Sequence, residues 1–223
     1  MKKFIQVAID GPAAAGKSTI AKIVAEQLGF IYIDTGAMYR AITWVVVNRG
    51  LAVDEEEAVI ANILAESVIE LAPGGQVFVN GFDVTTAIRE PAVTSVVSQV
   101  AAYQCVREDL KKRQAELAES DNVIMDGRDI GTNVLPNADF KFFMIADARV
   151  RAKRRYKENL ERGIPTDIDE LEQEIRVRDE LDATREHAPL RQADDAILLD
   201  TSNLTIDEVV AKIVITIASK SQA

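Results

Sequence analysis

The chain has 223 residues, 48% of them apolar, which is enough for one full hydrophobic core with small insertions but too few for two large domains. Its formal net charge of −10 argues against a long nucleic-acid-binding face and against binding to anionic membranes, because both repel an acidic surface. One cysteine and one histidine exclude an internal disulfide and a Cys/His zinc site.

The longest apolar stretches, such as residues 42–47, are far shorter than the roughly 20 residues that a membrane-spanning helix needs. The single Cys105 is typical of a reducing compartment. The sequence shows no coiled-coil repeat and no obvious exposed apolar strand. We therefore expect a cytoplasmic monomer that has neither a nucleic acid nor a membrane as its partner.

Short apolar runs followed by turn or charged residues are typical of parallel strands that are covered on both faces. In chain order they occupy residues 4–9, 31–33, 122–125, 141–145 and 196–199. Helical patterns separate them. These patterns cover residues 17–28, 37–48, 106–118, 148–162 and 205–219. Strands that alternate with helices predict an α/β fold.

Two segments interrupt this alternation. Residues 67–84 read as strands with turn signals at residues 73–75 and at Asn80-Gly81, which favour a small antiparallel insertion. Residues 149–185 are densely charged, and Gly-Ile-Pro at 163–165 divides them into two helices. This pattern indicates a helical hairpin that lies over a site.

Residues 11–18, Gly-Pro-Ala-Ala-Ala-Gly-Lys-Ser, match the phosphate-binding P-loop pattern. A predicted strand precedes the motif and a predicted helix follows it, so backbone N–H groups and the helix N-terminus converge on phosphate oxygens. We expect Lys17 to reach the β- and γ-phosphates of ATP, and the Ser18 hydroxyl to ligate Mg²⁺. The predicted ATP-binding residues are Gly11, Pro12, Ala13, Ala14, Ala15, Gly16, Lys17, Ser18 and Thr19.

Two further segments follow predicted strands and carry polar side chains. Residues 34–40 offer a hydroxyl, a helix N-terminus and an arginine to an acceptor, although a helix cap with a surface arginine would look the same. Residues 126–132 begin with Asp126 at a strand end, as in a Walker B site. Asp126 is thus predicted either to hold the metal or to fix Arg128, and a plain strand-end turn is the alternative.

The chain contains no Asn-Lys-x-Asp segment for reading guanine, which argues against a switch GTPase. Many arginines instead lie in the second half of one small unit. Guanidinium groups are the expected binding groups for an acceptor that itself carries phosphate. A kinase for small phosphorylated molecules is therefore favoured.

The motifs together resemble the bacterial cytidylate kinases from residue 4 to about residue 209. The resemblance rests on residues 11–18, 34–40, 97–102, 106–107, 127–132 and 178–185. It implies a P-loop NTPase-type three-layer α/β fold with a five-stranded parallel sheet. Within a single unit over residues 1–223, it also implies an acceptor-binding insertion at 36–102 and an arginine-bearing lid at 149–185.

The resemblance also implies roles for individual residues on the acceptor side. Ser98, Arg107 and Asp129 would read the cytosine, whose ring edge needs both donors and acceptors. Ser98 and Arg107 can meet only if the helix bends near Tyr103-Gln104, because residues nine apart face different ways on one helix. The full set of implied acceptor residues is Thr35, Arg40, Ser98, Arg107, Arg128, Asp129, Arg178, Asp182 and Arg185.

Thr35 stands where the family usually has serine. Arg40 and Arg128 would hold the acceptor phosphate, and Asp182 would accept from ribose hydroxyls. Spacings of four and three place Arg178, Asp182 and Arg185 on one helical face, although an ion pair on a solvated helix has the same spacing.

Among the arginines of residues 149–155, Arg154 best matches the position that neutralises the transferring phosphoryl group, although charge runs are usually solvated faces. The implied catalytic residues are Lys17, Arg128, Arg154, Arg178 and Arg185, and the implied metal ligands are Ser18 and Asp126. The implied reaction is transfer of the ATP γ-phosphoryl group to CMP or dCMP with Mg²⁺, which gives ADP and CDP or dCDP. The alternatives are a P-loop kinase of another small acceptor, such as shikimate, and a nucleotide-dependent switch or binding module.

Overall fold

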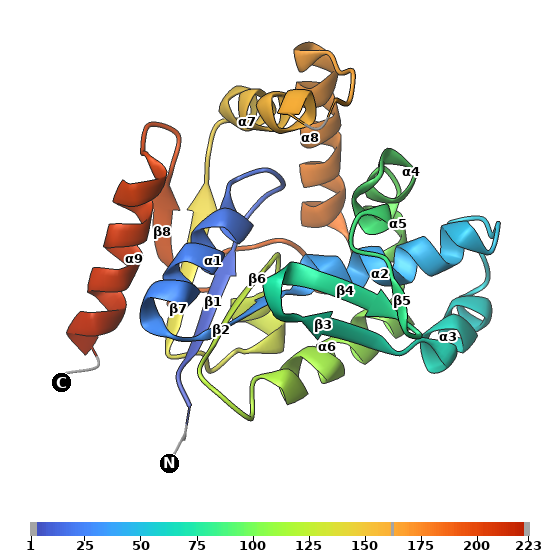
Figure 1. The fold of residues 1–223 in the computed structure, drawn as a ribbon, viewed down its shortest axis with the longest axis horizontal. Helices are drawn as coiled ribbons and strands as arrows, with labels where there is room; N and C mark the ends of the chain where they lie inside the picture. The colour runs from blue at the N-terminus through green and yellow to red at the C-terminus, as the bar shows by residue number, and fades with distance from the viewer. Residues whose placement is uncertain (1–3, 162, 221–223) are drawn as a thin grey trace.

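A computed structural model describes residues 4–161 and 163–220. Its centre is a five-stranded sheet in the order β2-β6-β1-β7-β8, and every pairing in it is parallel (Figure 1). The strands are β1 Gln6–Asp10, β2 Ile31–Asp34, β6 Val123–Gly127, β7 Phe140–Ile145 and β8 Ile197–Asp200. The predicted parallel sheet is confirmed.

The carboxyl ends of three strands meet at one edge of the sheet. Asp10 of β1 lies in register with Gly127 of β6, and Asp34 of β2 lies in register with Asp126. Each of these strands runs at least one residue beyond its predicted end, because the acidic residue that reads as a terminator still makes the backbone pairing. The acidic side chains are therefore held at the edge where ligands bind in parallel α/β sheets.

Helices cover both faces of the sheet. Helices α1 Lys17–Leu28 and α9 Ile206–Lys220 pack on one face, where Val24, Phe142 and Ile213 share a fully buried apolar cluster (Figure 1). On the other face a second cluster joins Ile33 and Met125 to the turn Ile130–Val134 and to Ala118, which directly follows helix α6. The result is the predicted three-layer α/β arrangement.

An insertion with its own core follows helix α2 Thr35–Asn48. The antiparallel strands β3 Ile69–Ala72, β4 Gln76–Val79 and β5 Phe82–Asp83 confirm the predicted small sheet. Asn80 and Gly81 both have positive φ, 51° and 81°, as the predicted tight hairpin turn requires. Helix α3 Glu57–Glu66 was not predicted, and it buries Ile60, Ile63 and Leu64 against this core.

Two short helices follow the small sheet, and a long helix comes after them. Helix α4 Pro91–Thr94 and helix α5 Val97–Val100 precede α6 Gln104–Leu117. The chain leaves helical geometry at Tyr103, whose φ and ψ are −60° and 133°. The bend that Ser98 and Arg107 require is therefore present.

Helices α7 Ala148–Glu161 and α8 Ile168–Thr184 form the predicted helical hairpin, and they lie over the loop between β1 and α1 (Figure 1). The predicted end of the first helix, at residue 162, lies outside the described residues. Asp167 caps α8 by accepting from the backbone N–H groups of Asp169 and Glu170. Across residues 4–161 and 163–220, no helix combines the length and the hydrophobicity that spanning a membrane requires.

Candidate active site

The P-loop connects β1 to α1, and both of its glycines have backbone geometry that other residues rarely adopt. Gly11 has a φ of 150°, and a Cβ there would lie 2.0 Å from the Met144 carbonyl oxygen. Gly16 has a φ of 88° and stands at the N-terminus of α1. The backbone can therefore turn tightly against β7 and leave the first N–H groups of α1 for an anion.

Lys17 is buried beneath the loop, and its Nζ donates to the Pro12 carbonyl oxygen at 2.7 Å. Burial, together with the nearby Arg128 guanidinium, lowers the pKa of Lys17 to about 7. A phosphate beside this amine would favour its charged form, because an adjacent negative charge raises the pKa of an ammonium group. The loop therefore favours an anionic ligand.

Asp126 lies beside Ser18 at the end of β6. Its carboxylate accepts from the Ser18 hydroxyl at 2.8 Å and from the Tyr32 hydroxyl at 2.7 Å. Burial and the neighbouring Asp34 raise the pKa of Asp126. The proposal that Asp126 fixes Arg128 is wrong for this structure, because Arg128 pairs instead with Asp182 at 2.9 Å. The Ser18–Asp126 pair is left as the candidate cation site.

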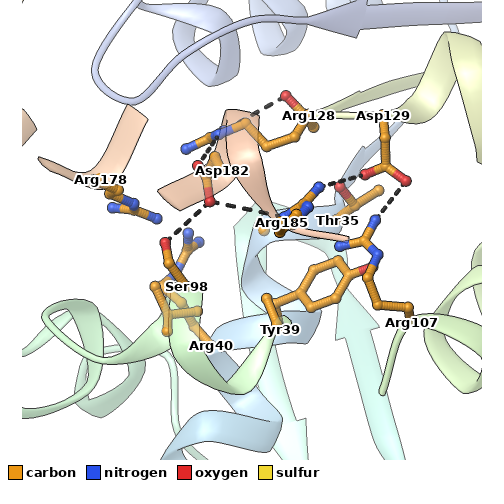
Figure 2. Close-up of a pocket in the computed structure, with 14 residues that line it drawn as sticks. Thr35, Tyr39, Arg40, Ser98, Arg107, Arg128, Asp129, Arg178, Asp182 and Arg185 are labelled. Atoms are coloured by element: carbon orange, nitrogen blue, oxygen red, sulfur yellow. Dashed lines mark hydrogen bonds and ion pairs between the residues drawn. The ribbon is translucent and has the colours of Figure 1, made fainter. Parts of the chain in front are cut away.

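A small cavity of about 60 Å³ lies on the opposite side of the β6 end. Every residue predicted for the acceptor side lines it, although these residues come from α2, α5, α6, the β6 end and α8 (Figure 2). They are Thr35, Arg40, Ser98, Arg107, Arg128, Asp129, Arg178, Asp182 and Arg185. The fold therefore brings together residues that lie up to 150 positions apart in the sequence.

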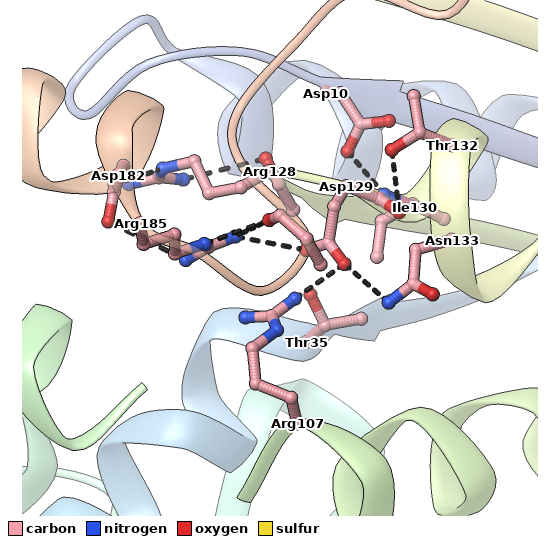
Figure 3. A network of polar contacts seen from close by, with 12 residues as sticks. Asp10, Thr35, Arg107, Arg128, Asp129, Ile130, Thr132, Asn133, Asp182 and Arg185 are labelled. Atoms are coloured by element: carbon pink, nitrogen blue, oxygen red, sulfur yellow. Dashed lines mark hydrogen bonds and ion pairs between the residues drawn. The ribbon is translucent and has the colours of Figure 1, made fainter. Parts of the chain in front are cut away.

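Two buried carboxylates organise the arginines (Figures 2 and 3). Asp129 pairs with Arg107 at 2.5 Å and with Arg185 at 3.4 Å. Asp182 pairs with Arg128 and also accepts from the Ser98 hydroxyl at 3.1 Å. These arginines lower the pKa of Asp182 although burial opposes the shift. Asp182 is therefore held ionised, in a cavity where the arginines outnumber the two carboxylates.

Arg178 lies in the same cavity with part of its hydrogen-bonding capacity unused. Its Nε is buried without a hydrogen-bond partner, as is that of Arg40, although Arg40 also pairs with Asp34 at 3.1 Å. Burial and repulsion from Arg128 lower the pKa of Arg178 to about 10. A buried donor without a partner is costly unless a ligand accepts from it, so this end of the cavity is suited to a phosphate.

Gly127 and Thr35 shape the floor of the same cavity. The Thr35 hydroxyl donates to the Asp126 carbonyl oxygen at 2.6 Å, so its oxygen faces the cavity only as an acceptor. A Cβ on Gly127 would lie 2.9 Å from that hydroxyl and 2.7 Å from the Ile130 side chain. The glycine that follows Asp126 is therefore required for the turn that carries Arg128 and Asp129 into the cavity.

The larger cleft has a volume of about 1030 Å³ and extends from the P-loop to the helical hairpin. It contains Lys17, Ser18 and Asp126, and it shares Arg40, Ser98, Arg128 and Arg178 with the small cavity. Its volume is at the upper end of that found for small-molecule sites. The two spaces thus adjoin and share part of their lining.

The arginines on α7 lie in different surroundings. Arg149 is partly exposed and pairs with Glu172, and Arg155 is paired with Glu158, so these two belong to a solvated face. Arg154 donates to the Thr201 carbonyl oxygen at 2.6 Å and approaches the Ala15 carbonyl at 3.5 Å. Of the predicted catalytic arginines, Arg154 alone is not brought to the acceptor-side cavity, and it lies on the P-loop side of the large cleft.

Sequence reasoning missed four residues of the site. Tyr39 lines the acceptor-side cavity with the Arg107 guanidinium 5.0 Å from its ring centre, and its spacing of four from Thr35 could have revealed it. Tyr32 and Arg151 have no comparable signal in the sequence. Tyr32 meets Asp126 and Arg151 meets the P-loop only because the elements that carry them pack together. The fourth residue is Asp10.

Asp10 connects the P-loop to the acceptor side (Figure 3). Its carboxylate accepts from the backbone N–H groups of Ile130 and Gly131 at 2.8 and 2.7 Å, directly after Asp129. Burial raises the pKa of Asp10 to about 7, well above the 3.8 of a free side chain. Folding therefore takes up a proton between these two pH values, and the free energy of unfolding falls there as pH rises.

We accordingly expect Asp10→Asn to remove this pH dependence. Relative to Asp10→Asn, the wild type should lose at most about 4 kcal/mol of unfolding free energy as the pH rises from 4 to 7. Urea denaturation at several pH values measures it, with the exposed Asp194→Asn as a control. A difference that is constant over this range would contradict a raised pKa at Asp10.

Comparisons with known proteins agree with one another. The sequence model of the cytidylate kinase family matches residues 7–219. The chain is 53% identical over 216 residues to a cytidylate kinase of Geobacillus thermodenitrificans, with 96% of both chains covered. It is 54% identical over 215 residues to one of Listeria monocytogenes, again with 96% of both covered.

Solved structures support the fold alone. A gluconokinase from Sinorhizobium meliloti superposes with a TM-score of 0.52 at 12% identity, covering 100% of this chain and 96% of that one. A protein from Eubacterium ventriosum superposes with a TM-score of 0.55, also at 12% identity, covering 96% and 99%. The three-layer arrangement thus recurs in proteins with very different sequences.

Proposed function

The chain belongs to the cytidylate kinase family, and on this premise we propose that its two adjoining spaces hold ATP and CMP with their phosphates facing each other. It is a nucleoside monophosphate kinase that transfers the γ-phosphoryl group of ATP to CMP or dCMP. The observation that carries the arrangement is Arg178, whose buried Nε has no hydrogen-bond partner and which lines both spaces. A chain that binds ATP alone has no use for a second cationic cavity.

For ATP, the proposal places the phosphates on residues 11–19, with Lys17 on the β- and γ-phosphates. The exposed N–H groups at the start of α1 and the positive end of its dipole support this placement. Arg154 lies against the same loop and would approach the transferred phosphoryl group from the side of the helical hairpin. We take residues 149–185 as the lid over ATP.

We take residues 36–102 as the acceptor-binding insertion. Together with neighbouring segments, it would form a cavity with three parts. Ser98, Arg107 and Asp129 would read cytosine, because together they offer the acceptors that its N4 amino group needs and the donors that its O2 and N3 need. Arg40, Arg128, Arg178 and Arg185 would surround the phosphate. Asp182, with one carboxylate oxygen bonded to Ser98, would accept from a ribose hydroxyl.

The reaction needs positioning and charge stabilisation rather than a general base. An α-phosphate oxygen of CMP, already anionic at neutral pH, would attack the γ-phosphorus in line as the bond to ADP breaks. Lys17, Arg128 and Arg178 would stabilise the charge on the transferred group. Exclusion of water by the lid would suppress hydrolysis of ATP.

Magnesium would be held by Ser18 and Asp126. No group of three acidic, histidine or cysteine side chains suited to a metal occurs in residues 4–161 and 163–220, so the remaining ligands would be ATP phosphates and water, as Mg²⁺ commonly prefers. The hydroxyl and carboxylate at 2.8 Å fit that mode of binding. When bound, the ion supplies charge neutralisation between the β- and γ-phosphates.

Asp126→Asn is expected to raise the Mg²⁺ concentration for half-maximal activity about tenfold, because the amide keeps the contact to Ser18 but has lost the charge. Activity titrated with Mg²⁺ at fixed ATP measures it. Asp121→Asn, an exposed site just before the same strand, is the matched control. An unchanged Mg²⁺ requirement in Asp126→Asn would remove Asp126 from the proposed metal site.

The alternative functions receive less support. A kinase of another small acceptor would not need a donor and acceptor set matched to cytosine, and a switch or binding module would not need the acceptor-side arginines. We also propose that the enzyme works as a monomer in the cytoplasm. The half-buried Cys105 is the chain's only cysteine, in accord with a reducing compartment, and gel filtration tests the monomer.

The test of the proposed function is turnover of ATP with CMP, dCMP, UMP, AMP and GMP as acceptors. CMP and dCMP should give the highest kcat/KM, because the purines present different hydrogen-bonding edges to Ser98, Arg107 and Asp129. Faster turnover of AMP or GMP than of CMP would contradict the cytidylate assignment.

A further inference from the structure

All three alanines in the P-loop contact the helical hairpin, and the firmest contacts are to Ala13. The Ala13 N–H donates to Asp179 Oδ1 at 3.2 Å, and the Ala13 carbonyl accepts from Arg151 Nη1 at 3.0 Å. Arg151 and Asp179 are themselves paired at 2.6 Å. One ion pair, with one partner on α7 and the other on α8, thus binds both backbone groups of a single loop residue.

The pair lies where its hydrogen bonds are strong. Arg151 is only 6% exposed, and its Nε donates to the Ala146 carbonyl oxygen at 2.8 Å, just before α7 begins. Hydrogen bonds made by ionised groups are shorter and stronger than neutral ones, and low local polarity increases the difference. The contact between hairpin and loop is therefore fixed in direction as well as close.

Ala14 is the residue that needs such support. Its φ is +56°, a left-handed conformation that costs a residue with a Cβ roughly 1 kcal/mol or more and costs glycine nothing comparable. Its side chain packs against the small apolar cluster of Ala152, Leu171 and Ile175, which belongs to the hairpin. An alanine loop left alone would favour negative φ at this position.

We propose that Arg151 and Asp179 are positioning residues that hold the P-loop in its phosphate-binding conformation against the strain at Ala14. The proposal rests on ATP being bound by this loop, as stated under the proposed function. Neither side chain belongs to the acceptor-side cavity. Their effect should therefore appear in ATP affinity and spare the acceptor.

The pair also makes the loop dependent on the hairpin. When α7 and α8 rest on the loop, Ala13 and Ala14 are held; when the hairpin moves away, the strained conformation loses its partners. ATP binding and seating of the hairpin are then coupled, because each favours the same loop conformation.

The experiment compares the Kd for ATP, measured by isothermal titration calorimetry, in the wild type and five variants. Asp179→Ala should weaken ATP binding about tenfold, while the KM for CMP at saturating ATP stays within about twofold of the wild type. Glu180→Ala, an exposed acid one residue further along α8, removes the same charge and should bind ATP like the wild type.

The double variant Arg151→Met with Asp179→Leu guards against a folding defect. Replacing both partners of a buried pair with apolar residues usually preserves stability, whereas removing one partner leaves the other charge buried and unpaired. This variant should keep its thermal midpoint within a few degrees and still bind ATP about tenfold more weakly.

Ala14→Gly supplies the decisive comparison. Because glycine adopts positive φ without strain, Asp179→Ala should weaken ATP binding only about twofold in the Ala14→Gly background. Wild-type ATP affinity in Asp179→Ala, or an equal loss with alanine and glycine at position 14, would overturn the proposal. Failure to form CDP would instead count against the acceptor assignment, since the ATP affinities are measured without CMP.

Discussion

Arg178→Met is expected to lower kcat/KM for CMP by roughly 10³, the range seen for arginines that stabilise a transferring phosphoryl group, and to make the free protein more stable. The first effect follows because Arg178 lines both parts of the site. The second follows because its Nε is buried without a partner and because burial and repulsion from Arg128 disfavour its charge.

The gain in stability should be about 1 kcal/mol, or a rise in Tm of roughly 2–4 °C for a chain of this size. Steady-state kinetics and differential scanning calorimetry measure the two effects. Arg176→Met is the matched control, because Arg176 lies on the same helix, is exposed and pairs with Glu172; it should leave both quantities nearly unchanged. A variant that lost stability and kept its activity would show that Arg178 is a structural residue.

Lys17→Met is expected to lower kcat by roughly 10³, because under the proposed function it removes the buried donor that stabilises the transferred phosphoryl group. It should also remove a pH dependence. The wild-type pKa of Lys17 is about 7, so above that pH the amine must take up a proton to bind ATP, and the affinity of the wild type should fall with rising pH.

The measurement is the Kd for ATP of the wild type and Lys17→Met between pH 6 and pH 9. The ratio of the two Kd values should approach one as pH rises, because the deprotonated lysine offers little more than methionine. Lys112→Met, at an exposed position of α6, should follow the wild type. A ratio that is independent of pH would contradict the lowered pKa of Lys17.

The sheet and the P-loop could be predicted from the sequence because their signals are local. Alternating apolar runs gave the parallel strands, and the sheet order then placed the ends of β1, β2 and β6 together. Helix α3 was missed because residues 57–66 follow an acidic run and its burial depends on the insertion's own core. The bend at Tyr103 formed without proline, since packing of α6 against the insertion determines where the helix begins.

The acceptor-side residues could be named from the sequence only through the family motifs. Spacing placed Arg178, Asp182 and Arg185 on one helical face, but nothing local showed that Asp182 would pair with Arg128, 54 residues away. The same limit explains the arginines of α7. Arg149 and Arg151 look alike in sequence, and Arg151 is buried because Asp179 and Ala13 meet it from other elements.

The two sides of the site are connected by residues that the motifs do not mark. Asp10 ends the strand that leads into the P-loop and also binds the turn after Asp129. Arg151 and Asp179 bind the P-loop from the hairpin. Asp10 and Ala13 therefore connect the P-loop by hydrogen bonds to the turn after Asp129 and to the helical hairpin.

The most direct test of the account is a single-turnover reaction of ATP labelled with ³²P at the γ-position, with enzyme in excess and CMP present. The two-nucleotide site predicts that the label passes to the β-phosphate of CDP in step with the appearance of ADP. It also predicts that little label is released when CMP is omitted. Label recovered as inorganic phosphate at the same rate with and without CMP would contradict transfer between two facing nucleotides.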